Sequence, residues 1–430
     1  MALFFWFCVG LIVYTYILYP LLVVVWAYFF PKPSRFVNAY LPSVSMVVAA
    51  YNEEEVIKQK LENCLAIDYP ADKIEFLFAS DGSSDRTNEI LVGAMQRPPR
   101  GIAPTCCQNV EAMPGLGQIA PKCGQNVGLR GIAPTGPPAS RGITPTAVKA
   151  FLYRERAGKL NVLNKLVPEA KGELLVFSDA NTMYEADAVR KLVRHFADPT
   201  VGGVCGKLRL VNPNQNVGGE GEGLYWRYEN VLKSSEGKIY AVIGANGAIY
   251  AIRRELFRPL PSQAVIMDDF LISLRVLEQG FRVIYEPEAV ASEKTSPDMQ
   301  GEFTRKVRIA AANFNGISYI KGLLNPLRGF VALALWSHKI VRWLVPFLAL
   351  AALVTNLFLL KLGGIYVVTL ALHLLLYAGA ILGYLGDRLF RHSGPFMLFY
   401  YLVTMNLAIF LGFWRSMTRT QKMAWERVEH

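Results

Sequence analysis

The pattern of hydrophobic positions changes along the chain, and each pattern predicts a different kind of structure. Residues 1–31 carry no charged side chain and exceed the about 20 apolar residues with which a helix crosses a bilayer. From Val44 onward, short apolar runs end in polar turns and alternate with stretches of helical spacing, which is typical of a doubly wound α/β sheet. After residue 300 a basic amphipathic segment precedes further apolar stretches. We therefore expect an α/β domain flanked by membrane segments.

Near-continuous apolar runs in the α/β region predict strands that are buried on both faces of a sheet. These runs lie at 44–50, 74–79, 148–153, 174–177 and 201–211. In an open α/β sheet, ligands bind at the carboxyl ends of the strands. The polar residues that directly follow the runs are therefore the first candidates for a functional site.

A repetitive segment at 97–146 interrupts the α/β pattern. The sequence Arg-Gly-Ile-Ala-Pro-Thr at 100–105 recurs at 130–135 and, with one change, at 141–146. Proline and glycine are frequent and acidic residues are scarce, which predicts a low-complexity, disordered insert. Its cysteines lack a nearby histidine and paired Cys-x₂-Cys spacing, which disfavours a zinc site; they are Cys106, Cys107 and Cys123.

Composition supports a membrane protein. Hydrophobic residues make up 52% of the chain, and the net charge is +11. No motif of a nucleic-acid module accompanies this charge, so we assign the cations to anionic lipid head groups and expect no nucleic-acid partner. Lys32 and Arg35 are the first cations and follow the first apolar stretch. The positive-inside rule then places the N-terminus outside and the α/β domain in the cytoplasm, at the cell (inner) membrane.

The C-terminal part predicts further membrane segments. Basic and apolar residues alternate over 301–342, which indicates amphipathic helices in the membrane surface, including one over 301–328 that residues 337–342 continue. Apolar stretches at 343–360, 364–386 and 395–414 predict three membrane-spanning helices, and a basic tail occupies 415–430. An even number of spans puts the basic tail outside, against the positive-inside rule. An interfacial or re-entrant helix among the three therefore stays an alternative.

The end of the strand at 174–177 carries Asp179 and Asn181. Carboxylate and carbonyl oxygens, together with phosphate oxygens, suit Mg²⁺ or Mn²⁺. The alternative is that Asp179 caps the helix that begins near Glu185. At the end of the strand at 74–79, Asp81 precedes Gly82, which permits a tight turn.

Other candidates lie on predicted helices. Lys159 opens a helix, where it can meet a phosphate, although a solvated lysine is an equal alternative. Trp226 either belongs to the core or stacks on a sugar. Asp268 and Asp269 occupy a first helical turn, where they either stabilise the helix dipole or supply a general base.

In their order and spacing, these motifs resemble those of membrane-bound inverting glycosyltransferases of family 2. This group includes cellulose, chitin, hyaluronan and poly-N-acetylglucosamine synthases. The motifs that carry the resemblance are Ala49-Ala-Tyr-Asn-Glu-Glu54, Ser80-Asp-Gly-Ser-Ser-Asp-Arg-Thr87, Gly158-Lys159 with Asn164, Asp179-Ala-Asn181 and Asp268-Asp269.

The resemblance implies a GT-A type doubly wound mixed sheet over 43–300, flanked by transmembrane helices, and a nucleotide-sugar donor, most often a UDP-sugar. It implies that Asp269 is the catalytic base with Asp268 beside it, and that Asp179 and Asn181 hold Mg²⁺ or Mn²⁺. The implied nucleotide-sugar-binding residues are Ala50, Asn52, Glu53, Asp81, Lys159, Asp179 and Arg308. Trp226 and Asn246 are the candidates for acceptor binding.

Two departures from the family pattern qualify these roles. The usual Asp-x-Asp ends in Asn181, a neutral ligand that implies weaker cation binding. The Gln-x-x-Arg-Trp motif of processive synthases is represented by 305–309, which keeps Arg308 but loses the glutamine and the tryptophan. Sugar transfer to a glycan or lipid-linked acceptor is the leading hypothesis. The alternatives are transfer of a single sugar to a polyprenyl phosphate or lipid, and a membrane protein that binds nucleotide-sugars without catalysis.

Overall fold

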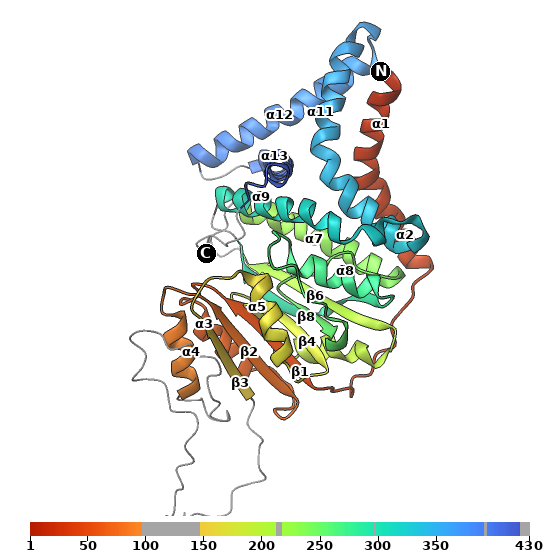
Figure 1. Ribbon diagram of the computed structural model, residues 1–430. Coiled ribbons are helices and arrows are strands. Elements are labelled where there is room, and N and C mark those ends of the chain that lie inside the picture. The colour runs from red at the N-terminus through yellow and green to blue at the C-terminus, as the bar shows by residue number, and fades with distance from the viewer. Residues whose placement is uncertain (97–146, 212–216, 296–297, 391–393, 422–430) are drawn as a thin grey trace, which may run out of the picture.

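The computed structural model of the 430-residue chain describes residues 1–96, 147–211, 217–295, 298–390 and 394–421. An α/β unit lies against a group of long helices, and the N-terminus is at the far end of that group (Figure 1). The insert predicted at 97–146, with its three cysteines, lies outside the described residues, as does most of the predicted basic tail.

The α/β unit contains an eight-stranded sheet in the order β3-β2-β1-β4-β7-β6-β8-β5. The strands β1 to β4 are parallel, whereas β7 runs antiparallel to β4 and β6. The mixed sheet expected from the sequence is therefore confirmed. The strands are β1 (Val44–Ala50), β2 (Ile74–Asp81), β3 (Ala147–Tyr153), β4 (Leu174–Asp179), β5 (Met183–Tyr184), β6 (Val201–Val211), β7 (Tyr250–Arg253) and β8 (Arg282–Lys294).

Alternate residues of the parallel strands pack into two separate apolar clusters, one on each face of the sheet. Met46 and Phe76 point into one cluster, and Val47 and Leu77 point into the other. This second cluster continues to Trp343 of the apolar helices. The helices of the α/β unit are α3 (Ile57–Leu65), α4 (Thr87–Gln96), α5 (Lys159–Leu166), α6 (Ala188–Val193), α7 (Val217–Ile239) and α8 (Asp268–Glu278). One face of the sheet thus shares its core with the long helices.

Four helices in the described part of the chain are long and apolar enough to cross a membrane. These helices lie where the apolar stretches predicted them. The second helix begins at Phe330, however, and not at residue 343 as predicted. Two contain a wider π-helical turn, at Tyr14–Leu18 and Leu335–Ile340. The elements are α1 (Ala2–Val13) and α2 (Tyr19–Phe29), α10 (Phe330–Ala334) and α11 (Val341–Leu359), α12 (Ile365–Phe390), and α13 (Met397–Met417).

The basic segment differs from its prediction. Helix α9 (Met299–Gly316) ends well before residue 328, and short 3₁₀ turns follow it. The Asn325 side chain accepts a hydrogen bond from the N–H of Leu327, and Gly329 has a φ of 60°. The bond at Asn325 and the positive φ at Gly329 separate these turns from the helix that begins at Phe330, because both compete with regular α-helical geometry. The prediction of one helix over 301–328 was therefore wrong, and 337–342 belongs to the second apolar helix.

Helix α9 packs closely against α13, with Gly412 at the contact. A Cβ atom at Gly412 would lie 2.5 Å from the Cβ of Ala310 and 2.7 Å from the carbonyl oxygen of Val307. We predict that Gly412→Ala destabilises the protein by about 1–3 kcal/mol, because two helix backbones must separate. The measurement is thermal unfolding in detergent. Gly10→Ala is the matched control, since a Cβ there meets no atom within 4 Å; equal melting temperatures for the two variants would contradict the prediction.

Candidate active site

A cavity of about 600 Å³ lies at the carboxyl ends of β1, β2 and β4 and continues between the apolar helices. It brings together nearly all of the residues that the sequence singled out. Those that line it are Ala50, Glu53, Asp81, Lys159, Asp179, Asn181, Trp226, Asn246, Asp268, Asp269 and Arg308. Asn52 does not line the cavity.

Lys159 connects two of the carboxylates. It is the first residue of α5 and follows Gly158, whose φ of 87° turns the chain into the helix. Its Nζ lies 2.7 Å from Oδ1 of Asp179 and 3.1 Å from Oδ2 of Asp268. One cation thereby holds together acids from the end of β4 and the start of α8, which are far apart in sequence.

Asp269 lies beside this pair and has no cation within ion-pair distance among the described residues. Its Oδ1 accepts a hydrogen bond from the N–H of Phe270 at 2.7 Å. A Cβ atom on Gly247 would come within 3.0 Å of its Oδ2, so only glycine leaves room for the carboxylate. Burial and the neighbouring Asp268 raise the pKa of Asp269 to about 6, although Lys159 opposes the shift. Such a carboxylate can accept a proton near neutral pH.

Asp81 holds the turn that carries Lys159. Its two carboxylate oxygens accept hydrogen bonds from the N–H groups of Ala157 and Gly158, at 2.7 and 2.8 Å. The neighbouring Gly82 permits this approach, because a Cβ there would lie 2.7 Å from the backbone nitrogen of Arg156. Sequence motifs alone did not reveal this positioning role.

Tyr51 and Arg156 form a flat surface that the sequence did not predict. The Arg156 guanidinium lies over the Tyr51 ring, 3.7 Å from its centroid, and both residues line the cavity. A stacked cation and aromatic ring suits a planar ligand group. The only available signal was the place of Tyr51 directly after β1.

Asn52 joins two strand ends. It has a φ of 54°, and its side-chain oxygen accepts a hydrogen bond from the N–H of Ser84 at 2.9 Å. Its own N–H donates to the Ser83 hydroxyl. A role of Asn52 in nucleotide binding stays a prediction.

The two candidates for acceptor binding differ in their surroundings. Asn246 is buried; its amide nitrogen donates to the carbonyl oxygen of Gly206 at 2.8 Å, and its oxygen accepts from Lys233. Trp226 is partly exposed, and Lys233 lies 5.7 Å from its ring centroid. Lys233 is thus a cavity residue that the sequence pattern of its helix did not single out.

Two family models match the chain. The one described as "Glycosyl transferase family 2" matches residues 45–103, and the one described as "Glycosyl transferase family group 2" matches residues 174–386. The matched parts contain Asp81, Asp179 and the Asp268-Asp269 pair. The chain belongs to glycosyltransferase family 2.

Individual family 2 relatives agree with this assignment. The chain is 24% identical over 284 residues to the probable glycosyltransferase YdaM of Bacillus subtilis (strain 168), which is 64% of this chain and 56% of that protein. It is 23% identical over 276 residues to the poly-beta-1,6-N-acetyl-D-glucosamine synthase of Staphylococcus aureus (strain COL), 63% of this chain and 54% of that protein. The chain therefore spans about half the length of the curated relatives it matches.

A solved structure supports the GT-A fold. The mannosyltransferase PcManGT from Pyrobaculum calidifontis superimposes with a TM-score of 0.64 and 22% identity. The match covers 97% of this chain and 100% of that one, including the apolar helices. The fold class expected from the sequence is therefore confirmed.

The residues present fit a divalent cation. Asp179 and Asn181 offer oxygen atoms, and the Asn181 amide donates to Oε1 of Glu293 at 3.2 Å. Within the described residues, no group of three or more His, Cys, Asp or Glu side chains could hold a metal alone. Mg²⁺ commonly binds through one or two carboxylates plus substrate phosphates. A cation here would therefore need oxygens from a bound diphosphate.

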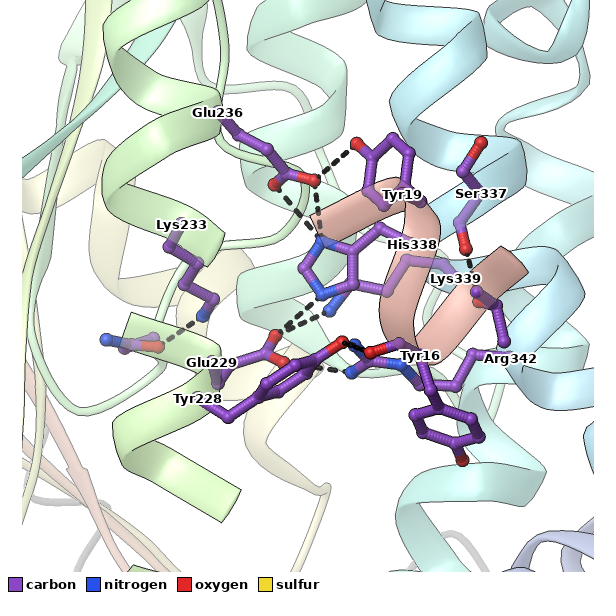
Figure 2. A network of polar contacts seen from close by, with 12 residues as sticks. Tyr16, Tyr19, Tyr228, Glu229, Lys233, Glu236, Ser337, His338, Lys339 and Arg342 are labelled. Atoms are coloured by element: carbon purple, nitrogen blue, oxygen red, sulfur yellow. Dashed lines mark hydrogen bonds and ion pairs between the residues drawn. The ribbon is translucent and has the colours of Figure 1, made fainter. Parts of the chain in front are cut away.

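A second charged cluster joins α7 to the apolar helices (Figure 2). Glu229 pairs with His338 at 2.9 Å, Lys339 at 3.1 Å and Arg342 at 2.9 Å. Oε1 of Glu236 lies 2.9 Å from the other ring nitrogen, Nδ1, of His338. Burial raises the pKa of Glu229, but Lys339, His338 and Arg342 outweigh it and hold that pKa well below its usual value. The cluster therefore contains ionised groups that are shielded from water.

We predict that Asp269→Asn stabilises the protein in a pH-dependent way. A raised pKa in the folded state means that the Asp269 carboxylate costs free energy once it ionises. The cost grows as pH rises from about 4, the pKa of an unfolded Asp, to about 6 and is then constant, at up to about 3 kcal/mol. Melting temperatures of both proteins in detergent from pH 4 to 8 measure this. A stability difference that does not change with pH would contradict it.

Proposed function

We propose that this family 2 member transfers a sugar from a nucleotide-sugar, with a UDP-sugar as first choice, to a glycan or lipid-linked acceptor. The reaction inverts the anomeric configuration and takes place at the cytoplasmic face of the membrane. The observation that carries the proposal is the shared cavity in which Lys159 pairs with Asp179 and Asp268 while Asp269 lies beside them.

The donor half of the cavity suits a nucleoside diphosphate. The stacked pair of Tyr51 and Arg156 offers a face for the base, and Ala50, Glu53 and Asp81 border it. Lys159 and Arg308 supply positive charge for the diphosphate. A divalent cation, Mg²⁺ or Mn²⁺, held by Asp179 and Asn181 would offset the charge of the leaving diphosphate. The PcManGT structure, which contains GDP-Man and Mn²⁺, supports this arrangement.

Asp269 is the proposed general base. The acceptor hydroxyl loses its proton to the Asp269 carboxylate while its oxygen bonds to the anomeric carbon. The bond from that carbon to the diphosphate oxygen breaks, and the nucleoside diphosphate leaves with the electron pair. General base catalysis of this kind contributes about 10²–10⁴-fold. Asp268 keeps Lys159 close to the reacting groups.

The acceptor half of the cavity points toward the membrane helices. Trp226 provides an aromatic face there, and Asn246 shapes the wall. The four apolar helices and the cations after the first of them support a multi-pass protein with its α/β domain in the cytoplasm. The length of the product shows whether the protein adds one sugar or many.

We predict that Asp269→Asn lowers sugar transfer by about 10²-fold or more, because the proton acceptor is lost. Nucleotide binding should persist, since the amide keeps the shape of the side chain. The measurement is transfer from a panel of labelled UDP- and GDP-sugars in membranes, with nucleotide binding measured in parallel. Asp68→Asn is the control, because Asp68 lies on the surface in an exposed pair with Arg190. Full activity of the Asp269 variant would exclude it as the base.

We further predict that Asn181→Asp tightens binding of the divalent cation by about tenfold, because a charged oxygen replaces a neutral one. Titration with Mn²⁺ in the presence of the nucleoside diphosphate, followed by electron paramagnetic resonance, reports free Mn²⁺ directly. Asn38→Asp adds the same charge at an exposed site outside the cavity and should change nothing. Unaltered Mn²⁺ affinity in the Asn181 variant would remove it from the cation site.

A further inference from the structure

The inner part of the cavity combines buried cations with an apolar wall. Lys233 of α7 and Lys339 and Arg342 of the second apolar helix line it. So do side chains of α13 and α11, namely Leu398, Leu402, Met405, Ile409 and Trp343. The proposed donor half uses none of these residues.

Lys233 is a buried cation whose charge is not balanced locally. It is 4% exposed, and its ammonium group donates to the neutral amide oxygen of Asn246. Among the described residues, no carboxylate lies within ion-pair distance of it. An ammonium group has three donors, and burying it without a counter-ion costs free energy. The site therefore favours an anionic ligand.

The two other cations share a single carboxylate. Lys339 and Arg342 both pair with Glu229, as Figure 2 shows. Glu236 is occupied by His338 and the Tyr19 hydroxyl. The Nε of Arg342 is buried and has no hydrogen-bond acceptor in the described structure. The total positive charge of Lys233, Lys339 and Arg342 thus exceeds the negative charge of Glu229. The Nε–H of Arg342 also remains available as a hydrogen-bond donor.

These cations lie next to the proposed base. Along the loop 244–247, a Cβ on Gly244 would lie 3.9 Å from the Cε of Lys339, Asn246 accepts from Lys233, and a Cβ on Gly247 would lie 3.0 Å from Asp269. One short loop therefore separates the cationic group from the carboxylate that accepts the proton. An anion bound there belongs to the acceptor, because the donor diphosphate has its own cations at Lys159 and Arg308.

The apolar wall distinguishes between acceptors. It comes from helices that are long and apolar enough to cross a membrane, so it matches the hydrocarbon chain of a lipid. A free phosphate or a neutral glycan would leave this wall without a partner. An amphiphile with a phosphate head group matches both the cations and the wall.

We propose that the acceptor is a phosphorylated lipid that carries a sugar: its phosphate binds Lys233, Lys339 and Arg342, its chain lies along α13, and a hydroxyl of its sugar gives up the proton to Asp269. This inference rests on the proposed sugar transfer and names its acceptor class. Lys233 is then a residue that determines specificity for a phosphate-bearing lipid over its neutral counterpart.

The test measures lipid binding by the full-length protein in detergent through tryptophan fluorescence, since Trp226 and Trp343 line the cavity. Polyprenyl phosphate should bind at least about tenfold more tightly than the polyprenol of equal length, the effect of one charged hydrogen bond. Lys233→Met should reduce this preference to near unity, whereas Lys233→Arg should retain it. Lys238→Met is the matched control, because Lys238 lies on the same helix with an exposed side chain.

The outcomes separate the inference from the proposed function. Equal binding of polyprenyl phosphate and polyprenol, or an unchanged preference in Lys233→Met with normal nucleotide binding, would overturn the inference. Competition by inorganic phosphate as strong as that by the phosphorylated lipid would also overturn it, since the chain would then add nothing. Transfer to neutral oligosaccharides alone would sustain the function and refute this acceptor. Selective binding of the phosphorylated lipid with no sugar transfer from any donor would refute the function and leave the phosphate site standing.

Discussion

Buried charge pairs between α7 and the second apolar helix hold the two halves of the protein together. His338 lies between Glu229 and Glu236, and all three side chains are almost fully buried. Burying a charge costs free energy unless the charge is paired, and removing one member of a pair leaves the other charge buried without a partner. The N-terminal helix joins the same cluster, because the Thr15 hydroxyl donates to the carbonyl oxygen of Ser337 at 2.7 Å. These contacts hold the walls of the cavity in place.

The same principle organises the sheet edge. Lys159 pairs directly with both Asp179 and Asp268, and its positive charge offsets part of the repulsion between these two carboxylates. Asp269 is one residue further along α8, and within the described part of the chain its carboxylate accepts a hydrogen bond from a single backbone N–H. The raised pKa of Asp269 suits a general base, and such environmental tuning is how paired carboxylates commonly divide their tasks. Local geometry, and not residue type, distinguishes Asp268 from Asp269.

Much of the fold followed from the sequence because the parallel strands are continuous apolar runs. The strand β8 escaped notice, since Glu286 and Glu288 interrupt its apolar residues; Glu286 is stabilised by Arg194 and His195 from a distant segment. The acids of the site were found because each follows a strand or opens a helix. Their convergence on Lys159 and the unbalanced charge of Lys233 depend on tertiary contacts, which spacing along one helix does not encode.

The helix from Phe330 contains a π-helical turn at Leu335–Ile340, which accommodates one residue more than an α-helical turn. Successive residues of an α-helix are rotated by about 100° around its axis, because a turn holds 3.6 of them. The extra residue therefore changes the direction in which every later side chain of this helix points around the helix axis. With regular α-helical winding throughout, Arg342 and Trp343 would face another side, and the apolar half of the helix would present a different set of side chains to its neighbours. A single added residue thus couples the chemistry of the cavity to the orientation of this apolar helix.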